Sequence, residues 1–189
     1  SRNFGMAQPE GYRKTARLMK MAEDFELPLI SFIDTPGAYP GIESEERGMS
    51  EAIAKNLSLL SNLKTPVIVI ITGEGGSGGA LAIGIGDHVC MLEHSIYAVA
   101  SPEACASIVW RDGSKAKDAA EAMKVDASNL RNLGLVDEVI EEPLGGAHRD
   151  IRGVSNSISQ VIEKKLQTFD EVDISDLLKK RYEKIMSYG

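Results

Sequence analysis

A cluster of small residues without reactive side chains lies in the segment GEGGSGGALAIG, residues 73–84. An apolar, mostly β-branched run at residues 66–72 precedes the cluster, and a short apolar run follows it. The cluster therefore joins a predicted strand to a predicted short helix. Unpaired N–H groups at a helix start, aided by the helix dipole, bind phosphates and stabilise developing oxyanions. The segment is thus a candidate site whose donors are main-chain amides.

A nucleophile motif fits the same segment. Gly75, Ser77 and Gly79 match G-x-S-x-G, in which the serine of a hydrolase attacks its substrate. Asp137 and His148 follow in the chain order that such a triad can use. A serine hydrolase or peptidase using Ser77 is therefore the alternative function.

A dinucleotide-binding motif also fits, because Gly73, Gly75 and Gly78 match G-x-G-x-x-G and Glu93 follows at the position of a ribose-binding acid. The helix after these glycines is short for a crossover between parallel strands, which disfavours this interpretation. No Lys-Ser/Thr pair follows the glycines, so the segment is not a P-loop. A purely structural interpretation remains, in which the glycines only allow close packing.

Composition narrows the class of protein. The chain has 189 residues and a formal net charge of −7, which argues against non-specific binding of nucleic acid. It has no apolar run long enough to span a bilayer. The two cysteines, Cys90 and Cys105, show no metal-binding spacing and predict reduced thiols, and with three scattered histidines we expect no metal site. The start at Ser1 indicates a fragment or a processed product.

Apolar periodicity predicts alternating helices and strands. The expected strands are residues 29–33, 66–72, 88–92, 96–100 and 135–140. The expected helices are residues 9–26, 44–63, a helix that Ser101 caps, helical turns within 114–133, and two amphipathic helices at 151–169 and 174–186. In the first helix we expect Leu18, Met21, Ala22 and Phe25 to face inward, and in the last we expect Lys179, Lys180 and Arg181 to face solvent. Continuous apolar strands predict a sheet covered on both faces, in a parallel α/β or layered ββα arrangement.

Seven segments together resemble one enzyme family: RNFGM, PEGYRK, FIDTPGAYPG, GEGGSGGALAIG, SPEACASIVW, EPLGGAHR and RYEKIMSYG. They are similar to the carboxyltransferase α subunit of the multisubunit acetyl-CoA carboxylase of bacteria and plastids. The resemblance runs from Arg2 to Gly189 and implies the C-terminal portion of that subunit. It implies a crotonase-like α/β fold of stacked ββα turns, with a core at residues 1–150 and a helical extension at 151–189.

The resemblance also implies a reaction and its participants. The carboxyl group of carboxybiotin, held on a biotin carboxyl carrier protein, passes to acetyl-CoA and gives malonyl-CoA, the first committed step of fatty acid synthesis. A carboxyltransferase β subunit completes an α2β2 assembly and holds the zinc, and ATP is used only by the partner biotin carboxylase. The implied location is the bacterial cytoplasm or the plastid stroma, with no metal in this chain.

Site residues follow from the same resemblance. The amides of Gly78 and Gly79 are implied to form the oxyanion hole for the ureido oxygen of biotin, where negative charge grows in the transition state. Gly75 and Gly76 are expected to border the substrate. The loop DTPGAYPG ends a strand near the same sheet edge, so Gly37 and Ala38 are expected either to border the biotin pocket or only to form a Pro-Gly turn. The β subunit is implied to hold the thioester enolate in an equivalent hole. On this view Ser77 is a small turn residue, and no role is assigned to His148.

Overall fold

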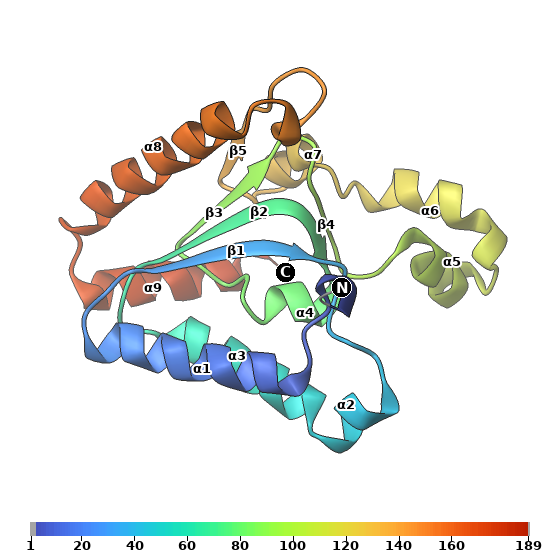
Figure 1. Ribbon diagram of the computed structural model, residues 1–189, viewed down its shortest axis with the longest axis horizontal. Coiled ribbons are helices and arrows are strands. Elements are labelled where there is room, and N and C mark those ends of the chain that lie inside the picture. The colour runs from blue at the N-terminus through green and yellow to red at the C-terminus, as the bar shows by residue number, and fades with distance from the viewer. Residues whose placement is uncertain (1–2, 189) are drawn as a thin grey trace.

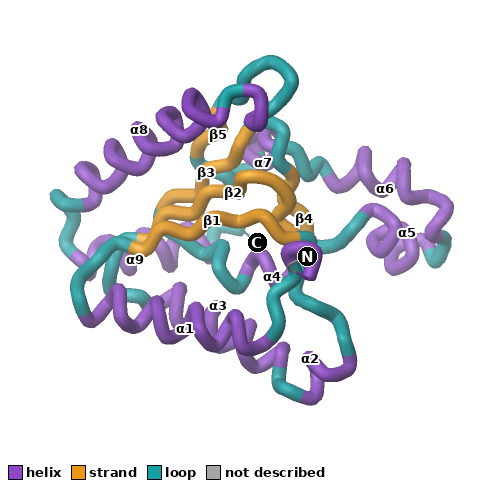
Figure 2. The backbone as a smooth tube through the Cα atoms, in the orientation of Figure 1, coloured by secondary structure: helices purple, strands orange, loops and turns teal. Residues whose placement is uncertain are grey.

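The structure, a computed structural model, describes residues 3–188. The apolar runs of the sequence form a single parallel sheet (Figure 1). The strands are β1 (Leu29–Thr35), β2 (Val67–Gly76), β3 (His88–Leu92), β4 (Ile96–Ala98) and β5 (Glu138–Ile140). The helices are α1 (Pro9–Asp24), α2 (Ile42–Glu46), α3 (Met49–Asn62), α4 (Ser77–Leu81), α5 (Pro102–Trp110), α6 (Ala116–Met123), α7 (Ala127–Asn132), α8 (Ile151–Phe169) and α9 (Ile174–Met186). The sheet lies between helices on both of its faces (Figure 2).

The strands are ordered β1-β2-β3-β5, and β4 pairs with the far end of β2. All pairs are parallel, including β2 with β3, so the short segment containing α4 does form a parallel crossover. Strand β2 is longer than expected because Glu74 to Gly76 continue the ladder, with Gly75 opposite Thr35 of β1 and Tyr97 of β4. The first third of the glycine segment, residues 73–76, is therefore strand, and the predicted strand-to-helix turn lies at Gly76 and Ser77.

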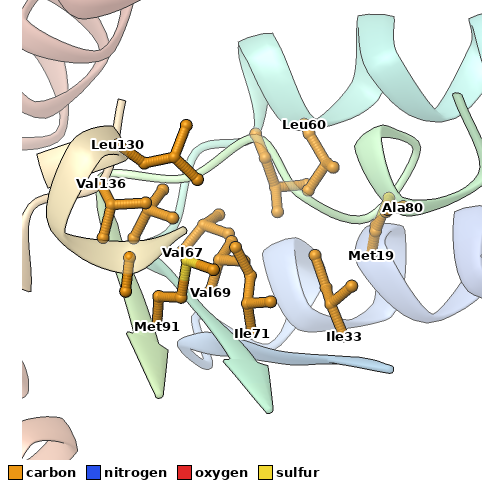
Figure 3. Packing of buried hydrophobic residues seen from close by; sticks show 13 residues of the cluster. Met19, Ile33, Leu60, Val67, Val69, Ile71, Ala80, Met91, Leu130 and Val136 are labelled. Atoms are coloured by element: carbon orange, nitrogen blue, oxygen red, sulfur yellow. The ribbon is translucent and has the colours of Figure 1, made fainter. Parts of the chain in front are cut away.

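Two apolar cores form on opposite faces of the sheet. The first joins β2 and β3 to α1, α3, α4 and α7, and its side chains interdigitate around Val67, Val69 and Ile71 (Figure 3). The second joins Ile68 and Ile70 to α8. Alternate β2 residues thus point to opposite cores, and each is fully buried. The expectation of a sheet covered on both faces is confirmed.

Helices α8 and α9 have the predicted bounds, and both pack on this chain. Helix α8 covers the second face of the sheet through Ile158, Val161 and Ile162. In α9, Leu177 is only 3% exposed. Arg181 was expected to face solvent, but it is 1% exposed and donates five hydrogen bonds into the body. That expectation was wrong because the sequence does not show which basic side chain will find buried hydrogen-bond acceptors in the fold.

The packed face of α1 also differs from the expected one. The helix turns Tyr12, Ala16 and Met19 inward. The expected residues stay largely exposed, at 46% for Leu18, 46% for Met21 and 68% for Phe25. The helix carries two apolar stripes, and the stripe that contains Tyr12 packs against α3 and the glycine turn.

Two further segments complete the description. The helix expected at residues 44–63 is broken into α2 and α3 at Gly48, whose φ of 77° ends one helix and starts the next. Helices α5 and α6 extend away from the sheet and pack mainly on each other (Figure 1). Ser101 caps α5 as predicted by accepting a hydrogen bond from the Ala104 amide. No helix within residues 3–188 combines the length and apolar character that a membrane span requires.

Candidate active site at the glycine turn

The site is built where β2 ends and α4 begins. Gly76 is extended, and Ser77 turns the chain into α4 with a left-handed φ of 57°, a conformation uncommon for a residue with a Cβ. This turn lies at the carboxyl end of β2, beside the carboxyl end of β1. The carboxyl edge of a parallel sheet is where such folds bind their ligands.

Packing requires bare backbone through this turn. A Cβ on Gly75 would lie 2.7 Å from the Tyr97 ring. One on Gly76 would overlap the backbone of Pro36, and one on Gly79 would overlap the Ala38 nitrogen. Close packing therefore accounts for glycine at these positions. It does so most strongly at Gly75 and Gly76, which are buried in the sheet.

The loop after β1 lies directly against α4, so the structure brings together the two segments that the sequence singled out. Gly37 faces Gly76 and Ser77, and Ala38 contacts Gly79. Thr35 holds this loop, since its hydroxyl donates to the Gly37 carbonyl at 2.9 Å and accepts from the Gly37 amide at 3.2 Å.

Gly78 and Gly79 lie in the first turn of α4, where amides have no partner within the helix. Neither amide donates to a described side chain or to a described carbonyl outside the helices and strands. A Cβ on Gly78 would meet nothing nearer than Ile53 at 3.8 Å, whereas Gly79 is buried beneath the Gly37–Ala38 backbone. The two donors differ in setting: Gly78 lies in the open part of the turn, and Gly79 in its packed part.

An apolar cavity of about 300 Å³ opens beside Ser77 and Gly78. Its walls come from α4, the segment after α4, β4, α7 and α9, with Leu81, Ile85, Tyr97, Leu130 and Ile185 among the lining residues. The wall from α9 is what the sequence missed, because nothing in the pattern of that helix indicates that it reaches this edge of the sheet.

Few polar side chains line the cavity. Burial raises the pKa of Tyr188 to about 12, helped by the nearby Asp137 carboxylate, and burial raises the pKa of Tyr97 as well. Both hydroxyls therefore stay protonated near neutral pH. Lys184 also lines the cavity, and its ammonium group is paired with Asp137. The cavity has no unpaired carboxylate among these groups, so it suits an uncharged ligand body.

The arrangement does not assemble a serine triad. Asp137 accepts from the Val89 amide at 2.7 Å and pairs with Lys184. His148 is exposed on the short helix η3 (Ala147–Arg149), near the start of α8 and across the sheet from α4 (Figure 1). The described hydrogen bonds include none between Ser77 and either residue. The geometry thus disfavours the nucleophile interpretation.

The predicted ribose acid lies elsewhere. Glu93 is exposed beyond the end of β3 and accepts a hydrogen bond from the Glu142 amide. It borders a second, more polar hollow with His94 and Arg131. The glycine turn and Glu93 therefore belong to different parts of the surface.

One group of potential metal ligands was not foreseen from the sequence. His88, Cys90 and Glu138 bring one ligand atom each within 4.8 Å of the others. The His88 Nε2 and Glu138 Oε2 atoms are hydrogen-bonded at 3.0 Å, and burial raises the pKa of the Cys90 thiol to about 12. Because the thiol is neutral and His88 and Glu138 are hydrogen-bonded to each other, we interpret this cluster as part of the packed interior.

Comparisons with known proteins place this site in context. A family model described as "Acetyl co-enzyme A carboxylase carboxyltransferase-like" matches residues 1–189. The acetyl-coenzyme A carboxylase carboxyl transferase subunit alpha of Vibrio cholerae is 59% identical, and that of Azotobacter vinelandii is 60% identical. These matches cover 100% of this chain but only 59% and 60% of those proteins, so the chain spans about three fifths of their length.

Solved structures share the fold at low sequence identity. Transcarboxylase 12S, with methylmalonyl-coenzyme A and methylmalonic acid bound, has a TM-score of 0.66 at 23% identity, over 82% of this chain and 31% of that one. A Pseudomonas malonate decarboxylase hetero-tetramer in complex with coenzyme A has a TM-score of 0.71 at 18% identity, over 94% and 72%. This likeness confirms the predicted crotonase-like α/β fold.

Proposed function

The chain belongs to the acetyl-coenzyme A carboxylase carboxyltransferase family, and from that premise we propose that it carries the carboxyl-transfer site of an α subunit. It accepts the carboxyl group of carboxybiotin, delivered by a biotin carboxyl carrier protein, for transfer to acetyl-CoA, and the product is malonyl-CoA. This is the first committed step of fatty acid synthesis and takes place in the cytoplasm or the plastid stroma. ATP is consumed only by the partner biotin carboxylase.

The observation that carries the proposal is the position of the Gly78 and Gly79 amides in the first turn of α4, where regular helical bonding leaves amides free. Main-chain donors aimed at an oxygen that becomes negative stabilise the transition state more than the ground state. Such donors need no ionisable side chain, which agrees with the absence of a serine triad from the described part of this turn. Gly78 is the donor with open space beside it, and Gly79 is held in place by the loop after β1.

The cavity beside Gly78 suits the bicyclic head of biotin. Its lining is largely carbon, with Leu81, Ile85 and Ile185 on its walls, and Gly78 is also part of the lining. When bound, carboxybiotin supplies the carboxyl group that is transferred. The residues of this chain orient the ring against apolar walls, exclude water and donate hydrogen bonds to the ureido oxygen. Gly37, Ala38, Gly75 and Gly76 shape the wall behind these donors.

A partner subunit completes the site in this proposal. The reaction develops a second oxyanion, on the thioester of acetyl-CoA, and the glycine turn of residues 76–79 serves the first. A carboxyltransferase β subunit supplies the second hole and the zinc, and two copies of each subunit form an α2β2 assembly.

Reconstitution tests the proposal. The chain and its β subunit are purified, combined, and assayed for biotin-dependent decarboxylation of malonyl-CoA, with each component omitted in turn. We expect turnover only from the complete mixture. Substantial turnover by this chain alone would contradict the shared site, and a stable complex without turnover would leave the chain only an assembly role.

A further inference from the structure

The carbonyl of Gly79 is bound by a side chain from a distant helix. In a regular α-helix this carbonyl would accept from Ile83, but the Ile83 amide donates to Ala80 at 3.1 Å instead. The Tyr12 hydroxyl, from α1, donates to the Gly79 carbonyl at 3.2 Å, and the contact is buried. Tyr12 therefore satisfies a main-chain acceptor that α4 leaves free.

The neighbouring peptide is held by a different bond. The Gly78 carbonyl accepts from the Ala82 amide at 2.9 Å, which fixes the peptide that carries the Gly79 amide. The Tyr12 bond fixes the next peptide, between Gly79 and Ala80. Glycine has no side chain to restrict its two torsions. Gly79 is thus held on one side by Ala82 and on the other by Tyr12.

Tyr12 is well suited to this task. Its side chain is 3% exposed and packs with Ala52 and Ala82 in a small core between α1, α3 and α4. Burial raises its pKa to about 12, so the hydroxyl keeps its proton throughout the working range of an enzyme. The hydroxyl would lie 2.7 Å from a Cβ at position 79, so it occupies the space that the missing side chain leaves.

We propose that Tyr12 is a positioning residue for the main-chain donors of the glycine turn, acting through its hydrogen bond to the Gly79 carbonyl. The inference rests on the proposed function, because it assigns the turn to transition-state stabilisation. Without the hydroxyl, Gly79 is held on one side only, so its torsions can shift and turn its amide away from the reacting oxygen. Stabilisation of the transition state should therefore weaken, while the affinity of the apolar walls for the biotin ring should stay the same.

The test replaces Tyr12 by Phe, which keeps the ring and removes the hydroxyl. In the assembly with the β subunit we expect kcat to fall about tenfold, with KM for the biotin substrate changed less than twofold. The matched control is Ala16→Gly, one turn along the same buried face of α1. It lowers helix stability, and Ala16 is not among the described neighbours of the glycines in the turn, so it should lower Tm and leave kcat near that of the parent.

A spectroscopic measurement separates the bond from its effect. The sequence contains three Gly-Ala pairs, at residues 37–38, 79–80 and 146–147. Labelling glycine carbonyls with ¹³C and alanine amides with ¹⁵N therefore gives one NMR signal for each pair. We expect Tyr12→Phe to shift the Gly79 carbonyl signal and to leave that of Gly146 in place.

Each result is decisive. An unshifted Gly79 signal, or a shifted signal with kcat unchanged in an active assembly, would overturn the positioning role and leave the proposed function standing. An equal loss of kcat in Ala16→Gly would reduce Tyr12 to a structural residue. A parent assembly that is itself inactive would overturn the proposed function, and the positioning role with it.

Discussion

Arg181 and Asp87 form a buried ion pair between positions 94 residues apart in the chain. The Arg181 Nε donates to one Asp87 oxygen at 2.8 Å and an Nη donates to the other at 2.7 Å. The remaining donors reach the carbonyls of Leu60, Leu63 and Thr65. One side chain thus ties α9 to the C-terminal end of α3 and to the starts of β2 and β3.

Arg181→Met should strongly destabilise the fold. It leaves the Asp87 carboxylate buried without its partner and removes the donors from three carbonyls, at an expected cost of about 3–5 kcal/mol in the free energy of unfolding. Arg181→Lys should recover little of this, because an ammonium group cannot reproduce the guanidinium fork. Urea unfolding measures both. Lys179→Met, at an exposed position of the same helix, should change stability by less than about 0.5 kcal/mol, and equal effects at 179 and 181 would contradict the assignment.

Gly78 allows a direct test of the amide donors. Gly78→Pro removes one N–H and should lower turnover of the assembled enzyme by about 10²–10³. Gly78→Ala keeps that N–H, and its Cβ has room, so turnover should stay within about tenfold of the parent. Circular dichroism and complex formation are checked for both variants before the assay. A folded, assembled Gly78→Pro enzyme with normal turnover would exclude this amide as a donor.

Gly79 should behave differently from Gly78. A Cβ at position 79 would lie 2.5 Å from the Gly37 carbonyl carbon and 2.7 Å from the Tyr12 hydroxyl. Gly79→Ala should therefore displace the loop after β1 and lower the free energy of unfolding by at least 1–3 kcal/mol, roughly the cost of overpacking. Thermal unfolding of the two alanine variants side by side makes the comparison, and equal stabilities would show that the two segments can separate at little cost.

Ser77→Ala distinguishes main-chain from side-chain chemistry. It keeps every amide of the turn, so the assembled enzyme should remain within about tenfold of normal turnover. A serine nucleophile would instead lose nearly all activity. The parent is also treated with a fluorophosphonate probe. Labelling at Ser77 together with a dead Ser77→Ala enzyme would favour the hydrolase alternative.

The thiols should react at very different rates. Cys90 is fully buried with a pKa near 12, so at pH 8 only about one thiol in 10⁴ is ionised. Cys105 is partly exposed. A disulfide reagent should therefore modify one thiol in the native chain and two in urea, and Cys105→Ser should abolish the native reaction. Rapid native labelling of that variant would show that β3 opens easily.

Elements with their own local signals could be predicted from the sequence. Asp150 caps α8 by accepting from the Gly153 amide, and the apolar stripes of α8 and α9 continue to their ends, so their bounds are as expected. The strands β2 and β3 were visible as apolar runs. The segment at residues 73–76 was not visible as strand, because glycine has no side chain to show period two.

The rest depended on contacts between distant segments. Tyr12, Thr35 and Arg181 act through main-chain carbonyls or amides brought near by the fold, and no spacing rule marks such acceptors. Residues Gly78, Gly79, Gly37 and Ala38 were singled out from the sequence and lie together in the structure, but the catalytic role given to them stays a prediction. The division of the chain at residue 150 stays a prediction too, since α8 packs on the sheet and α9 packs on α3, both of which belong to the preceding residues.

The position of α9 also sets an order of events during biosynthesis. All five strands leave the ribosome before Arg181 does, so the sheet can pair while Asp87 and the carbonyls of Leu60, Leu63 and Thr65 are still hydrated. Contacts this far apart in sequence close slowly, because a long loop must be ordered first. The wall formed by Ile185 and Tyr188 arrives with the same helix. We therefore expect a nascent chain to form its glycine turn before α9 closes this side of the cavity.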